Sequence, residues 1–304
     1  MFNRYIDELI TNLPRKKYKL NIVIEGGAFN GSYVLGILLF LKRMEKHKLL
    51  IVKKMSGCSV GGLLCFKYLT NDLNNSLREY KKLRKSFYYN QNLEVIKSSI
   101  NSNIEQLSNE KFKNIQENKL FLTFHDIINK RIVKKKYTDK DDLRSSLLKT
   151  CHLPFIIDGN CYFKEKGNYF LDGLLPHIFI DRSESFEDFI LYISPNTISR
   201  LKNMFITKNE ISIYGRVSEG ILDAYKFFFE GNSEMCSFVN RWSITNFVSL
   251  RIKSLAIFIF LYMVRLLSSF NRSILPYLRE IDLYNGAEDI IKLCFQDIFL
   301  KQCF

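Results

Sequence analysis

Two short apolar runs lie near the start of the chain. Each of them leads into glycine and is followed by a longer apolar stretch, a pattern that predicts a repeated strand–turn–helix unit. The first run covers residues 22–24 and the second covers residues 51–55. After them we expect helices over residues 31–46 and 59–69, the first apolar on most sides and therefore buried. Strand, turn and helix in this order, twice over, predict an α/β fold with a mainly parallel central sheet flanked by helices.

The hydrophobic pattern changes after this unit. Residues 71–150 are rich in Lys, Asn and Ser and are expected to be mostly helical. Short strands return in residues 151–193, with a hairpin around Gly167 and a buried strand at 190–193. From about residue 196 the chain is expected to be helical to its end, which adds a helical extension to the α/β fold.

The chain carries an excess of positive charge: 45 Lys and Arg stand against 31 Asp and Glu, a formal net charge of +14. Such an excess favours an acidic partner, either an anionic membrane surface or nucleic acid. An A/T-rich genome also supplies much Lys, and Asn, Ile and Phe are plentiful here too. The basic residues form no nucleic-acid motif, and the cluster at 131–136 is typical of a solvated face, so no nucleic-acid partner is expected.

The cysteines and the N-terminus indicate the compartment. Seven cysteines, an odd number, form no C-x-x-C pair and no zinc-type spacing with histidine. We therefore expect reduced, mostly buried thiols, no metal site and no cofactor. Residues 1–20 contain no apolar core of signal-peptide length. Both observations predict a cytoplasmic protein.

Gly57-Cys58-Ser59-Val60-Gly61 fits the pattern G-x-S-x-G and lies where the second predicted strand turns into its helix. At such a sharp turn glycines leave room for a strained backbone. The serine hydroxyl then stands at the helix N-terminus, where N–H groups favour negative charge. The motif alone is common by chance, but its position makes Ser59 the candidate nucleophile.

A second glycine-rich turn, Glu25-Gly26-Gly27-Ala28-Phe29-Asn30-Gly31, follows the first predicted strand. Glycines at a strand-to-helix turn let backbone N–H groups point into a pocket, where they can hold an oxyanion or a phosphate. A purely structural turn explains the same residues. Nucleotide binding is not favoured, because the spacing differs from G-x-G-x-x-G and no G-K-[ST] follows.

The group that accepts the proton of the serine hydroxyl, the general base, distinguishes between classes of serine hydrolase. An α/β-hydrolase needs serine, acid and histidine in this chain order, but the last of the four histidines, His177, follows Asp172 too closely to lie on a separate late loop. A dyad, in which a carboxylate takes the serine proton directly, remains. Asp172 fits this role because it ends a strand-like run and Gly173 permits a sharp turn. An ordinary Asp-Gly turn is the alternative.

In their order and spacing, the glycine-rich turn, the serine motif and Asp172-Gly173 resemble the patatin-like phospholipase family over roughly residues 19–195. Cys151-His152-Leu153-Pro154-Phe155 also resembles the family's small-x-x-Pro-Phe segment. The resemblance implies a dyad of Ser59 and Asp172, without a metal. It implies an oxyanion hole at Gly26, Gly27 and Ala28. The other motif residues are Asn30, Gly31, Gly57, Gly61 and Gly173.

Three positions depart from the family's motifs. Ala28 stands for the third glycine of G-G-G-x-[RK]-G, Asn30 for its basic residue, and Leu174 for the small residue after Asp-Gly. The nucleophile and the base are kept, so these departures concern phospholipid preference and rate.

The resemblance implies a lipid acyl hydrolase of the phospholipase A type, which cleaves fatty-acyl esters through an acyl-enzyme intermediate. The alternative is a catalytically weak or inactive relative that binds a membrane or a partner. A lipid substrate and an anionic membrane surface are the expected partners, and no obligate protein partner is inferred. We expect a basic helical segment over 1–18, the catalytic domain over 19–195, and a helical region over 196–304 that is a candidate for membrane association.

Residues 254–264 are the most apolar stretch of the C-terminal third, and Arg251 and Lys253 precede them. Eleven helical residues span only about 16 Å, against about 30 Å for a bilayer core, so a transmembrane segment is not favoured. Two other interpretations are favoured over it. One is a core helix, and the other is an interfacial helix with its basic flank on anionic head groups and Phe258 and Phe260 in the boundary. The second predicts peripheral, reversible membrane attachment.

Overall fold

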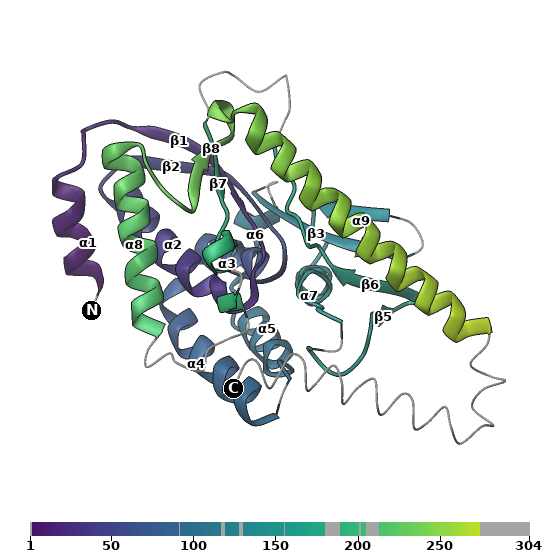
Figure 1. The fold of residues 1–304 in the computed structure, drawn as a ribbon. Coiled ribbons are helices and arrows are strands. Elements are labelled where there is room, and N and C mark those ends of the chain that lie inside the picture. The colour runs from purple at the N-terminus through teal and green to yellow at the C-terminus, as the bar shows by residue number, and fades with distance from the viewer. Residues whose placement is uncertain are drawn as a thin grey trace. The chain divides into compact units, whose positions relative to one another are not determined.

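A computed structural model describes most of the chain (Figure 1). The described residues are 2–90, 92–116, 119–127, 130–154, 156–179, 189–200, 202–204 and 213–273. Contacts divide the chain into two compact units. The first comprises Met1–Met204 and Glu210–Trp242, and the second comprises Phe205–Asn209 and Ser243–Phe304.

A mixed sheet with a parallel centre forms the core of the first unit. Its strand order is β5-β6-β3-β2-β1-β7-β8, and β4 also pairs with β3. The strands are β1 (Tyr18–Ile24), β2 (Leu50–Gly57), β3 (Leu120–Asp126), β4 (Lys130–Lys134), β5 (Phe163–Glu165), β6 (Asn168–Asp172), β7 (Phe189–Ile193) and β8 (Cys236–Phe238). β3, β2, β1 and β7 pair in parallel, whereas β4, β6 and β8 pair antiparallel with these strands. The predicted α/β fold with its mainly parallel central sheet is confirmed.

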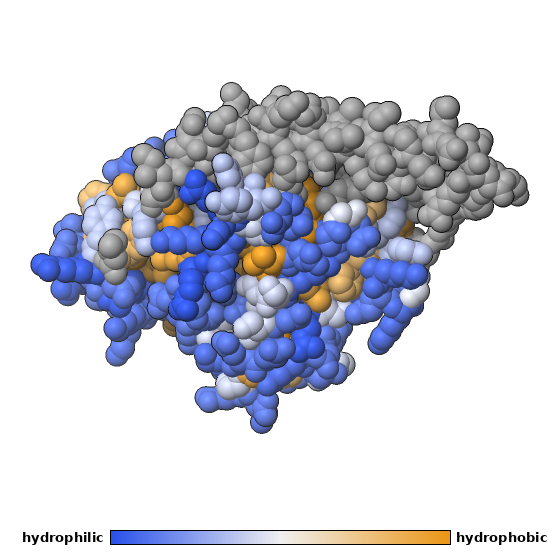
Figure 2. All heavy atoms as spheres, turned by 90° about the horizontal axis from the view of Figure 1, so that it is seen from below, coloured by the Kyte–Doolittle hydropathy of each residue, from blue (hydrophilic) through white to orange (hydrophobic). Residues whose placement is uncertain are grey.

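Helices flank this sheet (Figure 1). Those of the first unit are α1 (Phe2–Thr11), α2 (Gly31–Lys46), α3 (Ser59–Leu69), α4 (Leu73–Asn90), α5 (Val95–Glu105), α6 (Asn109–Gln116), α7 (Lys140–Thr150) and α8 (Ile213–Glu230). α2 is buried at every position of its first three turns, as its apolar pattern predicts. It packs on the sheet and on α8, where the rings of Phe40 and Phe228 lie 6.4 Å apart. The coloured part of the face in Figure 2 is mainly hydrophilic, with apolar residues in small patches.

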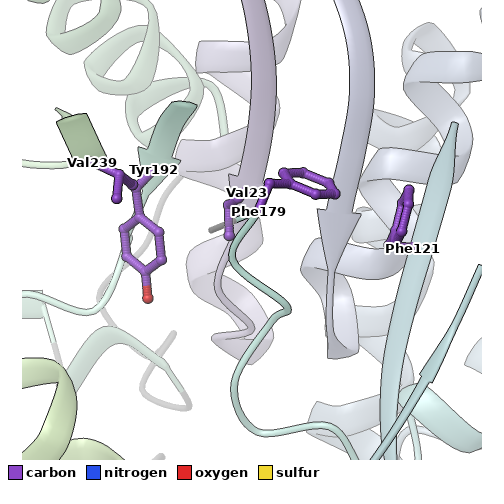
Figure 3. Close-up of a cluster of buried hydrophobic side chains, with 5 residues drawn as sticks. All are labelled: Val23, Phe121, Phe179, Tyr192 and Val239. Carbon is purple, nitrogen blue, oxygen red and sulfur yellow. The ribbon is translucent and has the colours of Figure 1, made fainter. Parts of the chain in front are cut away.

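An apolar cluster lies on the sheet face opposite α3. A Cβ at Gly61 of α3 would lie 3.0 Å from Cγ2 of Ile24, so the neighbouring Val23 points to the other face. The cluster there consists of Val23, Phe121, Phe179, Tyr192 and Val239 (Figure 3). The ring of Phe179 lies between the side chains of Val23 and Phe121, and its centroid is 5.0 Å from that of the Phe121 ring (Figure 3). The segment that follows β6 is therefore anchored to the sheet.

The prediction that residues 71–150 are mostly helical is confirmed, but it missed two strands. These residues form α4 to α7, but they also form β3 and β4. β3 has the sequence LFLTFHD and is buried at every position, so it lacks the alternation that marks a half-buried strand. The hairpin predicted around Gly167 is confirmed, since β5 and β6 pair antiparallel with Glu165 opposite Asn168.

The region after residue 196 is not helical throughout, because β8 pairs with β7. Three residues are too few for a period to show in the sequence. The region also divides between the two units: α8 packs with the first, and α9 (Ile244–Ser273) belongs to the second. Within the described residues, no helix combines the length and the apolar character that a membrane crossing requires.

Candidate active site

The serine motif forms a sharp turn between β2 and α3. Cys58 is extended, and Ser59, the first residue of α3, has φ 54°. A positive φ is strained for a residue with a Cβ and persists only where its surroundings hold it. Close packing supplies this restraint. A Cβ at Gly57 would lie 2.6 Å from the backbone of Gly61, and one at Gly61 would lie 2.6 Å from the carbonyl oxygen of Glu25.

Two threonines hold the backbone of Ser59 in place. The N–H of Ser59 donates to Oγ1 of Thr150 at 3.1 Å, and the Thr150 hydroxyl donates to the carbonyl of Thr123 at 2.6 Å. Both threonines are fully buried. Sequence reasoning missed them because they lie on β3 and at the end of α7, far from the serine in the chain. The only signal was the position of Thr150 directly before the Cys151–Phe155 segment.

Replacing Thr150 with valine should remove this hydrogen bond with little change in shape. The N–H of Ser59 would then be buried without its acceptor, at a cost of about 1–3 kcal/mol, and Ser59 would lose its fixed position. We expect turnover of a soluble ester to fall by at least about tenfold, with a lower thermal midpoint. Thr150→Ser keeps the hydroxyl and should retain most of the turnover. Equal turnover in the two variants would show that this bond does not position the serine.

β3 aligns the serine turn with Asp172. Gly57, at the end of β2, pairs with Leu122 of β3, and Asp172, at the end of β6, pairs with Phe124. The two β3 positions are separated by about 7 Å, since a strand rises about 3.3 Å per residue. The ends of β2 and β6 therefore meet against β3, although they are far apart in the sequence.

The chain turns directly after Asp172. A Cβ at Gly173 would lie 2.0 Å from the carbonyl oxygen of Thr123 and 2.8 Å from Cβ of Cys58, so only glycine fits between β3 and the serine motif. Leu174 has φ 54°, and its N–H donates to Oδ1 of Asp172 at 2.8 Å. This hydrogen bond fixes the orientation of the carboxyl group.

Asp172 is only 1% exposed, and burial has the largest effect on the pKa of its carboxyl group. Burial raises the pKa of its carboxyl to about 7, and the hydrogen bonds from the Leu174 N–H and the Ser59 hydroxyl act in the opposite direction. Oδ2 has no partner of good hydrogen-bond geometry among the described residues, although the Ser59 hydroxyl is near enough to lower the pKa. A carboxyl that titrates near neutral pH beside a serine hydroxyl is suited to accept its proton.

The histidines make other contacts. Nδ1 of His125 lies 3.0 Å from the carbonyl oxygen of Asp172, and the carbonyl of His152 accepts the N–H of Asp172 at 3.0 Å. Both thus contact the backbone of this residue. His47 pairs with an aspartate of α1 at 2.9 Å, and His177 stacks on a phenylalanine of β3. The group that the fold brings to the serine hydroxyl is therefore a carboxyl.

The glycine-rich turn after β1 lies against Ser59. A Cβ at Gly26 would lie 2.9 Å from Cβ of Ser59. Gly27 has φ 156° and Ala28 has φ 44°, and the chain passes through a short 3₁₀ turn, η1 (Ala28–Asn30), into α2. Asn196 fixes the turn by donating from Nδ2 to the carbonyl of Gly26 at 2.7 Å. The residues expected to form the oxyanion hole thus lie beside the candidate nucleophile.

Asn30 and Gly31 anchor the far end of this turn. Asn30 is fully buried; its Nδ2 donates to the carbonyl of Arg200 at 3.0 Å, and its Oδ1 accepts from Arg216 at 3.5 Å. A Cβ at Gly31 would lie 2.5 Å from Cγ2 of Val60, so α2 begins in contact with the residue after Ser59. Sequence reasoning did not identify the two arginines, because they lie beyond residue 195 and belong to no motif.

A buried carboxylate, Glu25, holds the start of the turn. It accepts hydrogen bonds from the hydroxyl of Tyr192 at 2.6 Å and from that of Ser194 at 2.5 Å. Burial and the nearby Glu25 charge raise the pKa of the Tyr192 phenol. The glycine-rich turn is therefore tied to β7 as well as to β1.

The described part of the chain contains no second catalytic centre built on a thiol or on a metal ion. There, no group of three or more His, Cys, Asp or Glu side chains is placed to hold a metal ion. Five cysteines are described, all unpaired; Cys294 and Cys303 lie outside the described residues. Burial raises the pKa of the Cys58 and Cys151 thiols near the site, which makes both poor nucleophiles.

Comparison with known proteins gives one family. A family model described as patatin-like phospholipase matches residues 22–175, just over half of the chain's 304 residues. Neither the curated proteins nor the solved structures give a match. The matched range contains the glycine-rich turn, the serine motif and Asp172-Gly173.

Proposed function

Because the chain belongs to the patatin-like phospholipase family, we propose that it hydrolyses fatty-acyl esters of lipids, with Ser59 as the nucleophile and Asp172 as the base. One observation carries the proposal. A buried carboxyl with a pKa of about 7 lies against the hydroxyl of a serine that a strained strand-to-helix turn presents. An ordinary Asp-Gly turn on the surface would not place its carboxyl there.

In the proposed reaction, ionised Asp172 accepts the proton of Ser59 as Oγ attacks the ester carbonyl carbon. The carbonyl electron pair moves to oxygen, and the N–H groups of Gly26, Gly27 and Ala28, with that of Val60, stabilise the oxyanion. Collapse of this intermediate expels the alcohol, which takes the proton from Asp172 and leaves an acyl-enzyme. A water molecule, deprotonated by the same carboxylate, then releases the fatty acid.

The hydrogen bond of Ser59 to Thr150 supports the choice of Val60 as an oxyanion donor. The N–H of Ser59 already donates to the threonine hydroxyl, so the next N–H along α3 is the one that faces the substrate oxygen in this scheme. A helix N-terminus also favours the developing negative charge. Removing one such donor typically lowers the rate by about 10²–10³-fold.

The test of this function is the release of fatty acid by the purified chain from a panel of phospholipids and neutral glycerolipids. We expect release from at least one of these classes, and covalent labelling by a fluorophosphonate. The absence of both would favour the alternative, a catalytically inactive relative that binds a membrane or a partner.

We further propose that the protein attaches peripherally to an anionic membrane through α9. Its cytoplasmic location stays a prediction. Apolar side chains recur on this helix at intervals of three and four residues, which places them on one face. They are Ile244, Val248, Ile252, Leu255, Ile259 and Tyr262, each between 50% and 81% exposed. The exposed Arg251 lies on the same face. An exposed apolar face that also carries a cation is typical of a helix that lies in the lipid interface. The side chain of Phe260 lies outside the described residues.

Changing Leu255, Phe258 and Ile259 to serine should weaken binding of the chain to phosphatidylcholine vesicles that contain phosphatidylserine. We expect a loss of at least about tenfold, because three exposed apolar side chains would no longer enter the head-group boundary. Leu250 and Ile257 are half-buried on the same helix, and their change to serine should instead lower the thermal midpoint. Unchanged vesicle binding in the first variant would contradict the attachment.

A further inference from the structure

α4 presents a basic face that the proposed catalytic site does not use. Its sequence contains five cations, Arg78, Lys81, Lys82, Arg84 and Lys85, and a single acidic residue, Glu79. Glu79 is turned inward: it accepts from the buried Lys67 at 2.7 Å and from Ser99 at 2.7 Å. The one acidic side chain of the helix is therefore paired inside the fold, and its negative charge does not neutralise the cations on the outer face.

The exposed cations of α4 share one side. Arg78, Lys81, Lys82 and Lys85 are all exposed, and their spacing of three and four residues places them along one face of the helix. Lys81 contacts Tyr214 of α8, with Nζ 5.0 Å from the ring centroid. The positive charge thus lies along the outer face of the helix.

Exposed aromatic residues end this basic face. Tyr88 and Tyr89 are 58% and 69% exposed, and their rings contact each other at 5.1 Å. Nζ of Lys85 lies 5.9 Å from the ring centroid of Tyr89. Tyrosine has an apolar ring and a polar hydroxyl, which suits it to the boundary between head groups and acyl chains.

The inner face of α4 connects this surface to the candidate active site. The rings of Tyr80 and Phe87 pack on Phe29 at 5.5 Å and 5.4 Å, and the Tyr80 hydroxyl donates to the carbonyl of Phe29 at 3.4 Å. Phe29 directly follows the three residues of the proposed oxyanion hole. A lipid surface in contact with the outer face of α4 would therefore lie one helix away from the catalytic turn.

We propose that the α4 surface, defined as Lys81, Lys82, Lys85, Tyr88 and Tyr89, docks the protein on the anionic head groups of a lipid bilayer. The choice of a bilayer rests on the proposed lipid hydrolase function. Clustered cations attract an anionic leaflet, and each Lys near the surface adds to this attraction. The tyrosines enter the interface, and a substrate lipid then leaves the bilayer beside the glycine-rich turn.

Sedimentation of the full chain with vesicles of phosphatidylcholine and phosphatidylserine tests the surface. The chain carries Ser59→Ala throughout, so that no lipid is hydrolysed and the result does not depend on catalysis. Adding Lys81→Glu, Lys82→Glu and Lys85→Glu should weaken binding by roughly 100-fold or more, because three attractive charges become repulsive. The matched control reverses three exposed lysines elsewhere, Lys111, Lys113 and Lys136, and should change binding by less than about threefold.

A second variant, Tyr88→Ser with Tyr89→Ser, keeps the charge and should weaken binding by at least about tenfold, with an unchanged thermal midpoint. Equal losses in the α4 and control lysine variants would show an effect of net charge alone and would overturn the docking surface. Wild-type binding by the α4 variants would overturn it too. The docking surface would also be overturned if the chain bound a single-stranded oligonucleotide more tightly than vesicles and the α4 substitutions abolished the oligonucleotide binding. Failure of the chain to release any fatty acid would count against the proposed function and leave these binding results intact.

Discussion

Replacing Ser59 with alanine should lower turnover of a soluble ester by at least about 10⁴-fold, because no other group then forms the acyl-enzyme. The variant should also lose covalent labelling by fluorophosphonate. Ser59 is 7% exposed at the start of α3, and the loss of one hydroxyl there leaves the packing of Gly57 and Gly61 unchanged. We therefore expect a thermal midpoint close to that of the wild type.

A matched control for this change lies on β2. Ser56 is fully buried, and its hydroxyl has no hydrogen-bond partner among the described residues. Ser56→Ala removes the same atom close to the site and should keep turnover within about threefold of the wild type. Turnover or labelling that persists in Ser59→Ala would exclude Ser59 as the nucleophile.

Replacing Asp172 with asparagine should lower turnover by several orders of magnitude, on the order of 10³-fold or more. The amide matches the carboxylate in shape but cannot accept the proton of Ser59. In the wild type, kcat/KM should rise about tenfold per pH unit up to a pKa of about 7 and then level off, because only the ionised form of Asp172 acts as the base. A fall in kcat/KM as the pH rises through 7, or a profile that Asp172→Asn leaves unchanged, would contradict this role.

The same titration has a consequence for stability. The pKa of Asp172 is raised on folding from 3.8 to about 7. The protonated carboxyl is therefore favoured by the fold, and this contribution is complete below about pH 4 and is lost as the pH rises through 7. Asparagine has no such loss. The difference in thermal midpoint, Asp172→Asn minus wild type, should therefore increase from acidic to mildly alkaline pH. A variant whose fold is merely disrupted would instead be less stable than the wild type at every pH.

The sequence is informative where the structure is local. The Ser59 turn, the turn at Gly26 and Gly27, and the strand before Asp172 are each built from consecutive residues, so a short motif predicts each of them. The helices over residues 31–46 and 59–69 follow from their continuous apolar patterns, and the structure has them at these bounds.

The contacts that assemble the site are not local and could not be predicted in the same way. Ser59 and Asp172 meet because both strand ends pair with β3. The sequence of β3 has neither alternation nor a motif, so nothing distinguishes this strand from the mostly helical region around it. Thr150, Asn196 and the groups around Asn30 act through single hydrogen bonds over large separations in the chain. Such contacts depend on the tertiary fold and leave no periodic signal.

Peptide mapping of the fluorophosphonate adduct, by mass spectrometry at several pH values, tests the proposed dyad most directly. We predict a single adduct on Ser59, formed at a rate that falls as the pH drops below about 7 and that is low in Asp172→Asn at every pH. An adduct on another residue, or an equal labelling rate with and without the Asp172 carboxyl, would contradict the Ser59–Asp172 dyad.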